Sequence, residues 1–261
     1  TSPFAFTGNR FEFRAVGSSQ SVSGPLVAMN TMLADSLNWI AGQLEAALEG
    51  GTSQAEAVVA VLKELMTEHG NVVFGGDGYS EEWHRMAVEE RGLKNIPTTA
   101  DALPALKEAS VIELFSSTGV LSPVELESRF EVYAEQYVLS IEVEAKLVID
   151  MARTMICPAA TTYLASLAST SESLAAMGVE LDDSIPRAVA PKLNEMIAAT
   201  ARLETTLSKH DFPSTEEHMQ YCATEIRPLM DEVRAAADSL EGYVSDELWP
   251  LPKYQEMLFI K

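Results

Sequence analysis

Three charged residues near the start of the chain alternate with two phenylalanines: Arg10, Phe11, Glu12, Phe13 and Arg14. In a β-strand successive side chains point to opposite faces, so the three charged groups would line about 13 Å of one face. The two phenyl rings would anchor the other face in a core. A carboxylate between two guanidinium groups stays ionised and can hold a divalent cation, while the guanidinium forks bind phosphate or carboxylate. The pattern therefore predicts a phosphoryl-transfer site with a metal, a nucleotide and an acidic substrate.

The same alternation has a second interpretation without chemistry. Charged residues on one strand face are common as a ladder of salt bridges on the solvated side of a sheet. The pattern alone does not separate a site from such a ladder, so both interpretations stay open.

Other residue types that carry chemistry are scattered. The four histidines, His69, His84, His210 and His218, lack the spacing of metal ligands, so we expect each to be solvated or to cap a helix. Cys157 and Cys222 fall on apolar helix faces, where buried structural thiols are the usual case. Two cysteines cannot build a disulfide framework, which favours a reducing, cytoplasmic setting.

A glycine-rich stretch, Gly75-Gly76-Asp77-Gly78, could cradle phosphate, but it lacks the Lys-Ser/Thr end of a P-loop. A sharp turn that requires positive φ is the preferred interpretation. A mobile flap over a site is a further hypothesis for this stretch.

The secondary structure that must position these residues changes from β-strand to helix after about residue 25. Residues 2–16 alternate in polarity, with Gly8-Asn9 as a turn, which predicts a strand or hairpin. Residues 16–25 read as a loop. Residues 26–48 then carry a helical stripe that we expect to be buried: Leu26, Met29, Leu33, Leu37, Ile40 and Leu44.

Capping signals predict further helix starts at Ser53, Ser80, Thr99, Ser110, Ser122 and Ser214. A long helix is expected from Ser122 to Gly178, kinked at Pro158, followed by helices over residues 184–208 and from Ser214 onward. Their apolar seams predict antiparallel packing in a helical bundle. The two prolines in Trp249 to Tyr254 predict an extended tail.

Composition and charge limit the functional class. The chain has 261 residues, 47% of them hydrophobic, which is ordinary for a globular protein. Thirty-nine acidic and eighteen basic residues give a net charge of −21, which disfavours binding to nucleic acid and to anionic membranes. No run of about 18 apolar residues predicts a spanning helix, and no signal peptide is visible. Because the chain begins at Thr1 directly in predicted β structure, we expect it to be a piece of something longer.

Residues 1–19, TSPFAFTGNRFEFRAVGSS, resemble the final catalytic strand of glutamine synthetases, and more narrowly of the long type III enzymes. The shared motif is Arg-x-Glu-x-Arg, followed by a loop and a helix that opens near Gly24-Pro25-Leu26. Gly75 to Trp83 (GGDGYSEEW) and Trp249 to Pro252 (WPLP) also resemble type III sequences. The resemblance thus touches the whole chain.

The resemblance implies ATP-dependent ligation of ammonia to glutamate through a γ-glutamyl phosphate, with Mg²⁺ or Mn²⁺, in a cytoplasmic homo-oligomer of stacked rings. It assigns Glu12 to metal binding, Arg14 to glutamate and Arg10 to the ATP phosphates. Two departures stand out: Thr1 to Asn9 lacks an arginine that many relatives carry, and Val16-Gly17 replaces the wider family's Pro-Asp.

The predicted fold is therefore mainly α, with a remnant strand or hairpin and helices of a catalytic domain before an antiparallel bundle. We expect residues 1–70 to end the catalytic domain, 71–120 to connect, and 121–261 to form the bundle. The remaining metal ligands would lie outside this chain, so we expect it to be inactive alone. The alternative is a helical interaction or oligomerisation module without a catalytic role.

Overall fold

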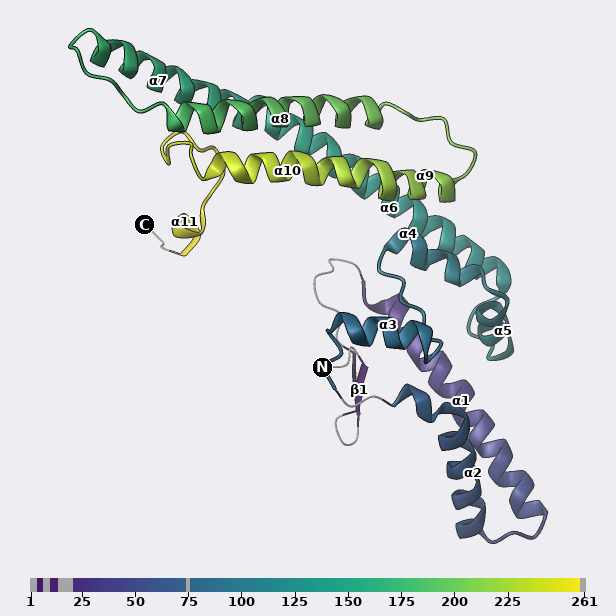
Figure 1. Ribbon diagram of the computed structural model, residues 1–261. Coiled ribbons are helices and arrows are strands. Elements are labelled where there is room, and N and C mark those ends of the chain that lie inside the picture. The colour runs from purple at the N-terminus through teal and green to yellow at the C-terminus, as the bar shows by residue number, and fades with distance from the viewer. Residues whose placement is uncertain (1–3, 7–9, 14–20, 74–75, 259–261) are drawn as a thin grey trace. The chain divides into compact units, whose positions relative to one another are not determined.

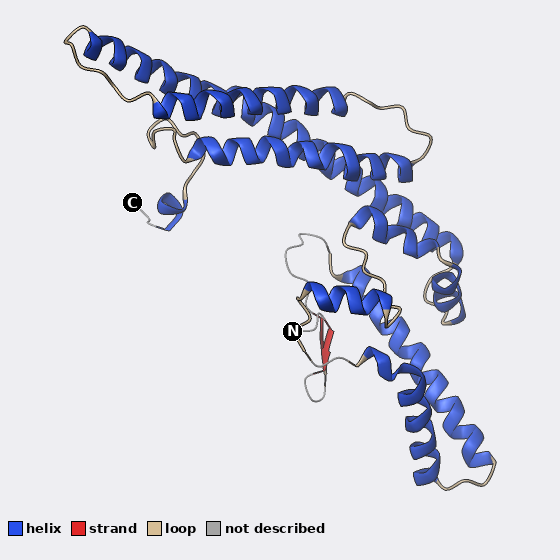
Figure 2. Cartoon of the chain, viewed as in Figure 1, coloured by secondary structure: helices blue, strands red, loops and turns tan. Residues whose placement is uncertain are grey.

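The computed structural model describes residues 4–6, 10–13, 21–73 and 76–258, and almost all of the ordered elements are helices (Figures 1 and 2). They form two compact units, residues 1–130 and 131–261. Within the described part of the chain, no helix has both the length and the apolar composition needed to cross a membrane. The predicted mainly helical fold is therefore confirmed.

The first unit contains two short strands and several helices. Its elements are β1 (Phe4–Phe6), β2 (Phe11–Phe13), α1 (Ser23–Glu49), α2 (Gln54–His69), the 3-10 turn η1 (Gly70–Val72), α3 (Glu81–Glu89), α4 (Thr99–Ala102), the 3-10 turn η2 (Leu103–Lys107) and α5 (Ala109–Ser117). The strands pair antiparallel. The predicted turn at Gly8-Asn9 and most of the loop over 16–25 lie outside the described residues, and α1 begins at Ser23, before Pro25.

α1 and α2 pack side by side after a turn at Gly50-Gly51 (Figure 1). Gly51 adopts φ +86°, a conformation that side chains rarely reach. Ser53 accepts a hydrogen bond from the Glu56 amide, and the Glu56 carboxylate accepts one from the Ser53 amide, so the predicted capping box is confirmed.

The predicted buried stripe of α1 is wrong for this chain. Leu26, Leu33 and Leu37 are exposed, Leu37 by 55%. On α2 only Ala57 and Val61 are buried. Two packed helices cover only the line along which they touch, so each keeps its remaining apolar side chains in solvent.

Two predicted helix starts in this unit are also corrected. Thr98, and not Thr99, accepts the capping hydrogen bond, from the Asp101 amide. α5 begins at Ala109 after Glu108, and Ser110 lies inside the helix without capping it. The start at Ser80 is confirmed, since its hydroxyl accepts from the Trp83 amide.

α6 (Pro123–Met151) begins at a second capping box, in which Ser122 and Glu125 exchange hydrogen bonds. The bundle of the second unit then consists of the later part of α6, a π-helical turn η3 (Ala152–Ile156), α7 (Cys157–Ala175), α8 (Ser184–Leu207), α9 (Thr215–Tyr221), a π-helical turn η4 (Cys222–Ile226) and α10 (Arg227–Glu241). A short helix, α11 (Tyr254–Leu258), follows the Trp249–Tyr254 stretch that was predicted to be extended.

The buried side chains of the bundle lie on the apolar faces of α6, α8, α9 and α10, and Figure 1 shows the path of these helices. α8 packs most extensively on α10. The buried side chains on these faces include Ala134, Ile141 and Ala145 of α6, Val189, Leu193, Met196 and Leu203 of α8, and Met219, Cys222, Ile226, Val233 and Leu240 of α9 to α10.

Each π-helical turn ends two residues before a proline. The Cys157 amide donates to the Ala152 carbonyl and the Arg227 amide to the Cys222 carbonyl, five residues back, ahead of Pro158 and Pro228. Proline has no amide proton, and its ring clashes with the carbonyl four residues back in a regular helix. The wider π turn removes this clash, so the helix continues past the predicted kink at Pro158 as α7.

Candidate functional site

The structure places the Arg-x-Glu-x-Arg segment on and beside β2. Glu12 is the middle residue of that strand and lies opposite Ala5 of β1. Arg10 is exposed and directly precedes the strand, and Arg14 lies outside the described residues. The backbone therefore supplies the strand on which the three residues are predicted to share a face, and their shared face stays a prediction.

A complete metal site is not formed by the described residues, among which no group of three or more His, Cys, Asp or Glu side chains lies close enough together. Mg²⁺ prefers six oxygen ligands, several of them water or substrate oxygens. Glu12 could contribute one carboxylate to such a set. The other protein ligands would have to come from outside the described part of the chain.

The glycine-rich stretch leads into α3 through hydrogen bonds of its own. The Asp77 carboxylate accepts from the Tyr79 amide at 3.0 Å, and the Ser80 hydroxyl donates to the Asp77 carbonyl at 3.1 Å. Gly78 does not adopt positive φ, so the expected left-handed turn is wrong at this residue. The Asp77 carboxylate forms the turn instead. Gly75 lies outside the described residues.

Arg91 holds the backbone of residues 71–73, which precede the glycine-rich stretch. Its guanidinium donates to the carbonyls of Asn71 and Val73, at 2.8 and 3.1 Å, and lies 5.1 Å from the centre of the Trp83 ring. The polar groups of Asp77, Ser80 and Arg91 are thus used to hold the backbone, which is a structural role.

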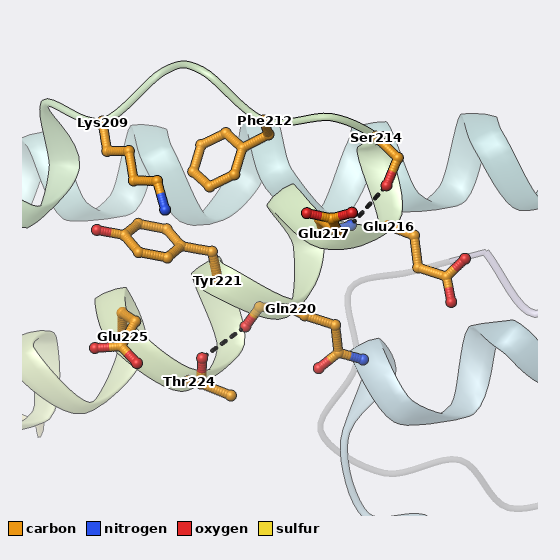
Figure 3. A pocket seen from close by; sticks show the side chains of 9 residues that line it. All are labelled: Lys209, Phe212, Ser214, Glu216, Glu217, Gln220, Tyr221, Thr224 and Glu225. Atoms are coloured by element: carbon orange, nitrogen blue, oxygen red, sulfur yellow. Dashed lines mark hydrogen bonds between the residues drawn. The ribbon is translucent and has the colours of Figure 1, made fainter.

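The hollow between α8 and α9 is a second candidate site (Figure 3). It encloses about 690 Å³ and is lined by the loop after α8 and by one side of α9 and η4. The rings of Phe212 and Tyr221 contact each other with centres 5.1 Å apart, and the Lys209 ammonium lies near both, 4.8 Å from the centre of Phe212 and 4.5 Å from that of Tyr221. An ammonium over an aromatic face is attracted by the electron-rich ring.

This aromatic arrangement continues into the bundle. Phe212 stacks on His218 with ring centres 4.1 Å apart. The Tyr221 hydroxyl donates to the Thr206 carbonyl at 3.0 Å, and burial raises the pKa of Tyr221, with Glu225 adding to the shift. The hydroxyl therefore stays protonated and holds the end of α9 to the end of α8.

His218 differs from its prediction as a solvated or capping residue. Its side chain is only 21% exposed, and its Nε2 lies 3.2 Å from a carboxylate oxygen of Glu142, which is 14% exposed. Sequence reasoning missed this pair because the two residues are far apart in the chain. The one local signal was the grouping of Phe212, His218 and Tyr221 around the capping residue Ser214.

The prediction of buried thiols is confirmed for Cys222 but not for Cys157. Cys222 is fully buried, and burial raises its pKa to about 11, with the Glu142 carboxylate adding to the shift. Cys157 is half-buried, and burial likewise raises its pKa, against a smaller opposing effect of Arg153. A thiol whose pKa is raised is protonated at neutral pH and is a poor nucleophile.

The hollow at Lys209 thus contains a cation beside two contacting aromatic rings, but none of the residues that the sequence nominates. All of the nominated residues belong to the Arg-x-Glu-x-Arg segment, of which the structure describes residues 10–13, with Glu12 in β2. The two candidate sites lie in different units of the chain, and each is considered by itself.

Comparison with known proteins shows similarity of sequence to one family. Residues 57–175 match the family model of the glutamine synthetase C-terminal domain. The whole chain is 38% identical to the type-3 glutamine synthetase of Dictyostelium discoideum and 33% identical to a glutamine synthetase of Bacteroides fragilis. A glutamine synthetase of Butyrivibrio fibrisolvens is 30% identical over 99% of the chain.

These relatives are much longer proteins. The chain spans 36% of the Dictyostelium protein and 37% of each bacterial one. The family model covers α2 to α7, so the match extends from the first unit into the bundle of the second. The chain is therefore similar over its whole length to part of a type-3 glutamine synthetase, and residues 57–175 match the C-terminal domain of glutamine synthetases.

Proposed function

We propose that this chain is part of a cytoplasmic glutamate–ammonia ligase, which forms glutamine through a γ-glutamyl phosphate at the expense of ATP. The observation that carries the proposal is that relatives named glutamine synthetases align with the whole chain, including the Arg-x-Glu-x-Arg strand. A chain that shared only the helical bundle would align over residues 131–261 alone.

The proposal gives each charged residue of that strand a role. Glu12 is one ligand of Mg²⁺ or Mn²⁺, a metal that neutralises charge on the transferring phosphate. Arg10 binds the ATP phosphates, and Arg14 binds the glutamate substrate through the fork of its guanidinium. The pairing of β2 with β1 supports this assignment, because a strand can hold alternate side chains on one face.

The proposal also divides the chain into residues 1–70 that end the catalytic domain, a connector over 71–120, and a bundle over 121–261. The exposed apolar side chains of α1 and α2 support the first part. Leu37, Leu62 and Met66 are each more than half exposed, and a catalytic domain that continues beyond these residues would cover them.

The isolated chain is expected to be inactive under this proposal, because it offers too few metal ligands among its described residues. The intact enzyme is expected to act as a homo-oligomer of stacked rings. The alternative, an interaction module with no catalytic role, keeps the bundle and makes the strand a structural ladder.

Substitution of Glu12 by alanine in the full-length enzyme separates the two functions. We expect glutamate- and ammonia-dependent ATP hydrolysis to fall by about 100-fold or more, because a metal ligand at the reacting phosphate is lost. Glu64→Ala, an exposed acid on α2, is the matched control and should retain full activity. Equal activity of the two variants would favour the interaction module.

A further inference from the structure

α6 carries a second apolar stripe on the side opposite the bundle. Val132, Leu139, Val143 and Leu147 follow one another at spacings of seven, four and four residues. At 100° per residue these positions lie about half a turn from Ala134, Ile141 and Ala145, which are buried in the bundle core. All four stripe residues belong to the second unit.

The stripe is open to solvent within the described part of the chain. Its four side chains are each between 54% and 56% exposed. Three of them, Val132, Leu139 and Val143, line a shallow, open groove along the surface of α6. A helix that is apolar on two opposite faces is typical of a helix covered on both sides, whereas scattered exposed leucines would need no explanation.

Acidic side chains border the stripe. Glu135 and Glu144 line the same groove, and the helical angle places them on opposite edges of it. From Glu131 to Met151 the sequence has five acids and a single base, Lys146. The Lys146 ammonium lies 3.5 Å from the Glu142 carboxylate on its own helix, so its charge is already partly offset.

We infer that this face of α6, defined by Val132, Leu139, Val143 and Leu147, binds an amphipathic helix with lysine or arginine on both edges of its apolar stripe. An apolar helix face between acidic edges matches a basic amphipathic helix in both shape and charge. A second copy of the chain fits less well, because it brings the same acidic edges and a net charge of −21. The inference goes beyond the proposed ligase activity and does not depend on it.

The test uses two synthetic probes and the 261-residue chain. One fluorescein-labelled peptide of about 21 residues, long enough for several helical turns, carries a leucine stripe edged by lysines; its twin has glutamate in place of every lysine. Fluorescence anisotropy measures the affinity of each probe. We expect the lysine probe to bind at least about 10-fold more tightly than the glutamate probe, and less tightly as salt rises.

Substitutions show where the lysine probe binds. Leu139→Gln with Val143→Gln should weaken binding by about 10-fold or more, because buried apolar contact is lost. Met177→Gln with Val179→Gln, at two exposed apolar residues of the α7–α8 turn, is the matched control and should change binding less than about 2-fold. Glu135→Gln with Glu144→Gln should weaken binding and reduce its salt dependence. Circular dichroism checks the fold, and the single variant Leu139→Gln replaces the double one if that fails to fold.

Several outcomes would overturn the inference. These are equal weakening by the control pair, equal binding of both probes, or dimerisation of the chain that the Leu139/Val143 variant abolishes. Binding to the 261-residue chain but not to the full-length enzyme would show that the enzyme itself covers the face, and would also overturn it. Activity of the Glu12 variant has no bearing on any of these results.

Discussion

Cys222 is the residue whose chemistry the surrounding structure changes most. Its thiol is fully buried at the start of η4, and burial raises its pKa to about 11 from an ordinary value of 9.0. At pH 8 an ordinary thiol with a pKa of 9.0 is about one-tenth thiolate, and a thiol with a pKa near 11 is about one-thousandth thiolate. Iodoacetamide should therefore alkylate native Cys222 at least about 100-fold more slowly than it alkylates the same residue in urea.

Mass spectrometry of the two cysteine-containing peptides measures the reaction, and Cys157, which is half-buried, serves as the internal comparison. Equal rates at Cys222 in the native and unfolded chain would contradict the burial seen in the structure. Because the folded pKa lies above the unfolded value, this thiol favours folding fully below about pH 9. That contribution, about 3 kcal/mol at most, is lost as the pH rises from about 9 to about 11.

For single residues, the sequence predicts the environment of a side chain when that environment depends only on the residue's position on its own helix. Cys222 lies on an apolar seam, so its burial could be read from helical spacing. His218 lies on the same helix run, but its environment depends on Glu142, which comes from a distant part of the chain. Periodicity gives the direction of a side chain and does not identify the neighbour that it meets.

Among the elements, α6 offers the clearest test of local sequence signals. The Ser122 hydroxyl accepts from the Glu125 amide, and the Glu125 carboxylate accepts from the Ser122 amide at 2.8 Å. Ser122→Ala should cost about 1 kcal/mol of the free energy of unfolding in urea, because one amide at the helix start loses its partner. Ser173→Ala, inside α7 and exposed, should change that free energy by less than about 0.5 kcal/mol.

The stability that the Ser122/Glu125 capping box contributes depends on pH, because it requires the ionised Glu125 carboxylate. Hydrogen bonds from Ser122 lower the pKa of Glu125 below its ordinary value of 4.5. A lowered folded pKa stabilises the fold above pH 4.5, and this stabilisation is lost as the pH falls through the folded value. The difference in stability between the chain and Glu125→Gln should therefore shrink at acidic pH, and an unchanged difference would contradict the box.

The correct and incorrect element predictions differ in how local their causes are. The starts at Ser53, Ser122 and Ser214 are confirmed because a cap needs only residues three positions apart. Ser110 has a box partner at Glu113, yet the helix starts two residues earlier than a Ser110 cap would place it, after Glu108, whose carboxylate contacts Lys94. The π turns before Pro158 and Pro228 were not predicted. The spacing of hydrophobic residues does not distinguish a π turn, which contains one extra residue, from a regular α-helical turn.

For the whole molecule, the two units differ in how well they cover their own apolar surface. Leu203 of α8 is fully buried in the bundle, whereas Leu37 of α1 is 55% exposed. In the 261-residue chain, Leu203→Ala should cost about 2 to 5 kcal/mol and Leu37→Ala less than about 1 kcal/mol. In the full-length enzyme Leu37→Ala should cost about 2 kcal/mol or more, because we propose that the rest of the catalytic domain covers it.

Thermal unfolding of both variants in both chains measures these differences. An equally small effect of Leu37→Ala in the chain and in the full-length enzyme would mean that nothing covers α1 there. The spacing of apolar residues on α1 predicted a buried stripe, but Leu26, Leu33 and Leu37 of that stripe are exposed. The spacing of residues identifies which face is apolar, and only the packing partner decides whether that face is buried.

The central claim is that Glu12 binds the catalytic metal of a glutamate–ammonia ligase. The most direct test is the affinity of the full-length enzyme for Mn²⁺, measured by electron paramagnetic resonance in the absence of turnover, for Glu12→Gln and the control Glu64→Gln. We expect Glu12→Gln to weaken Mn²⁺ binding by at least about 10-fold, because a neutral amide replaces a charged ligand, and Glu64→Gln to leave it unchanged. Equal affinities of the two variants would contradict the assignment of this strand to metal binding.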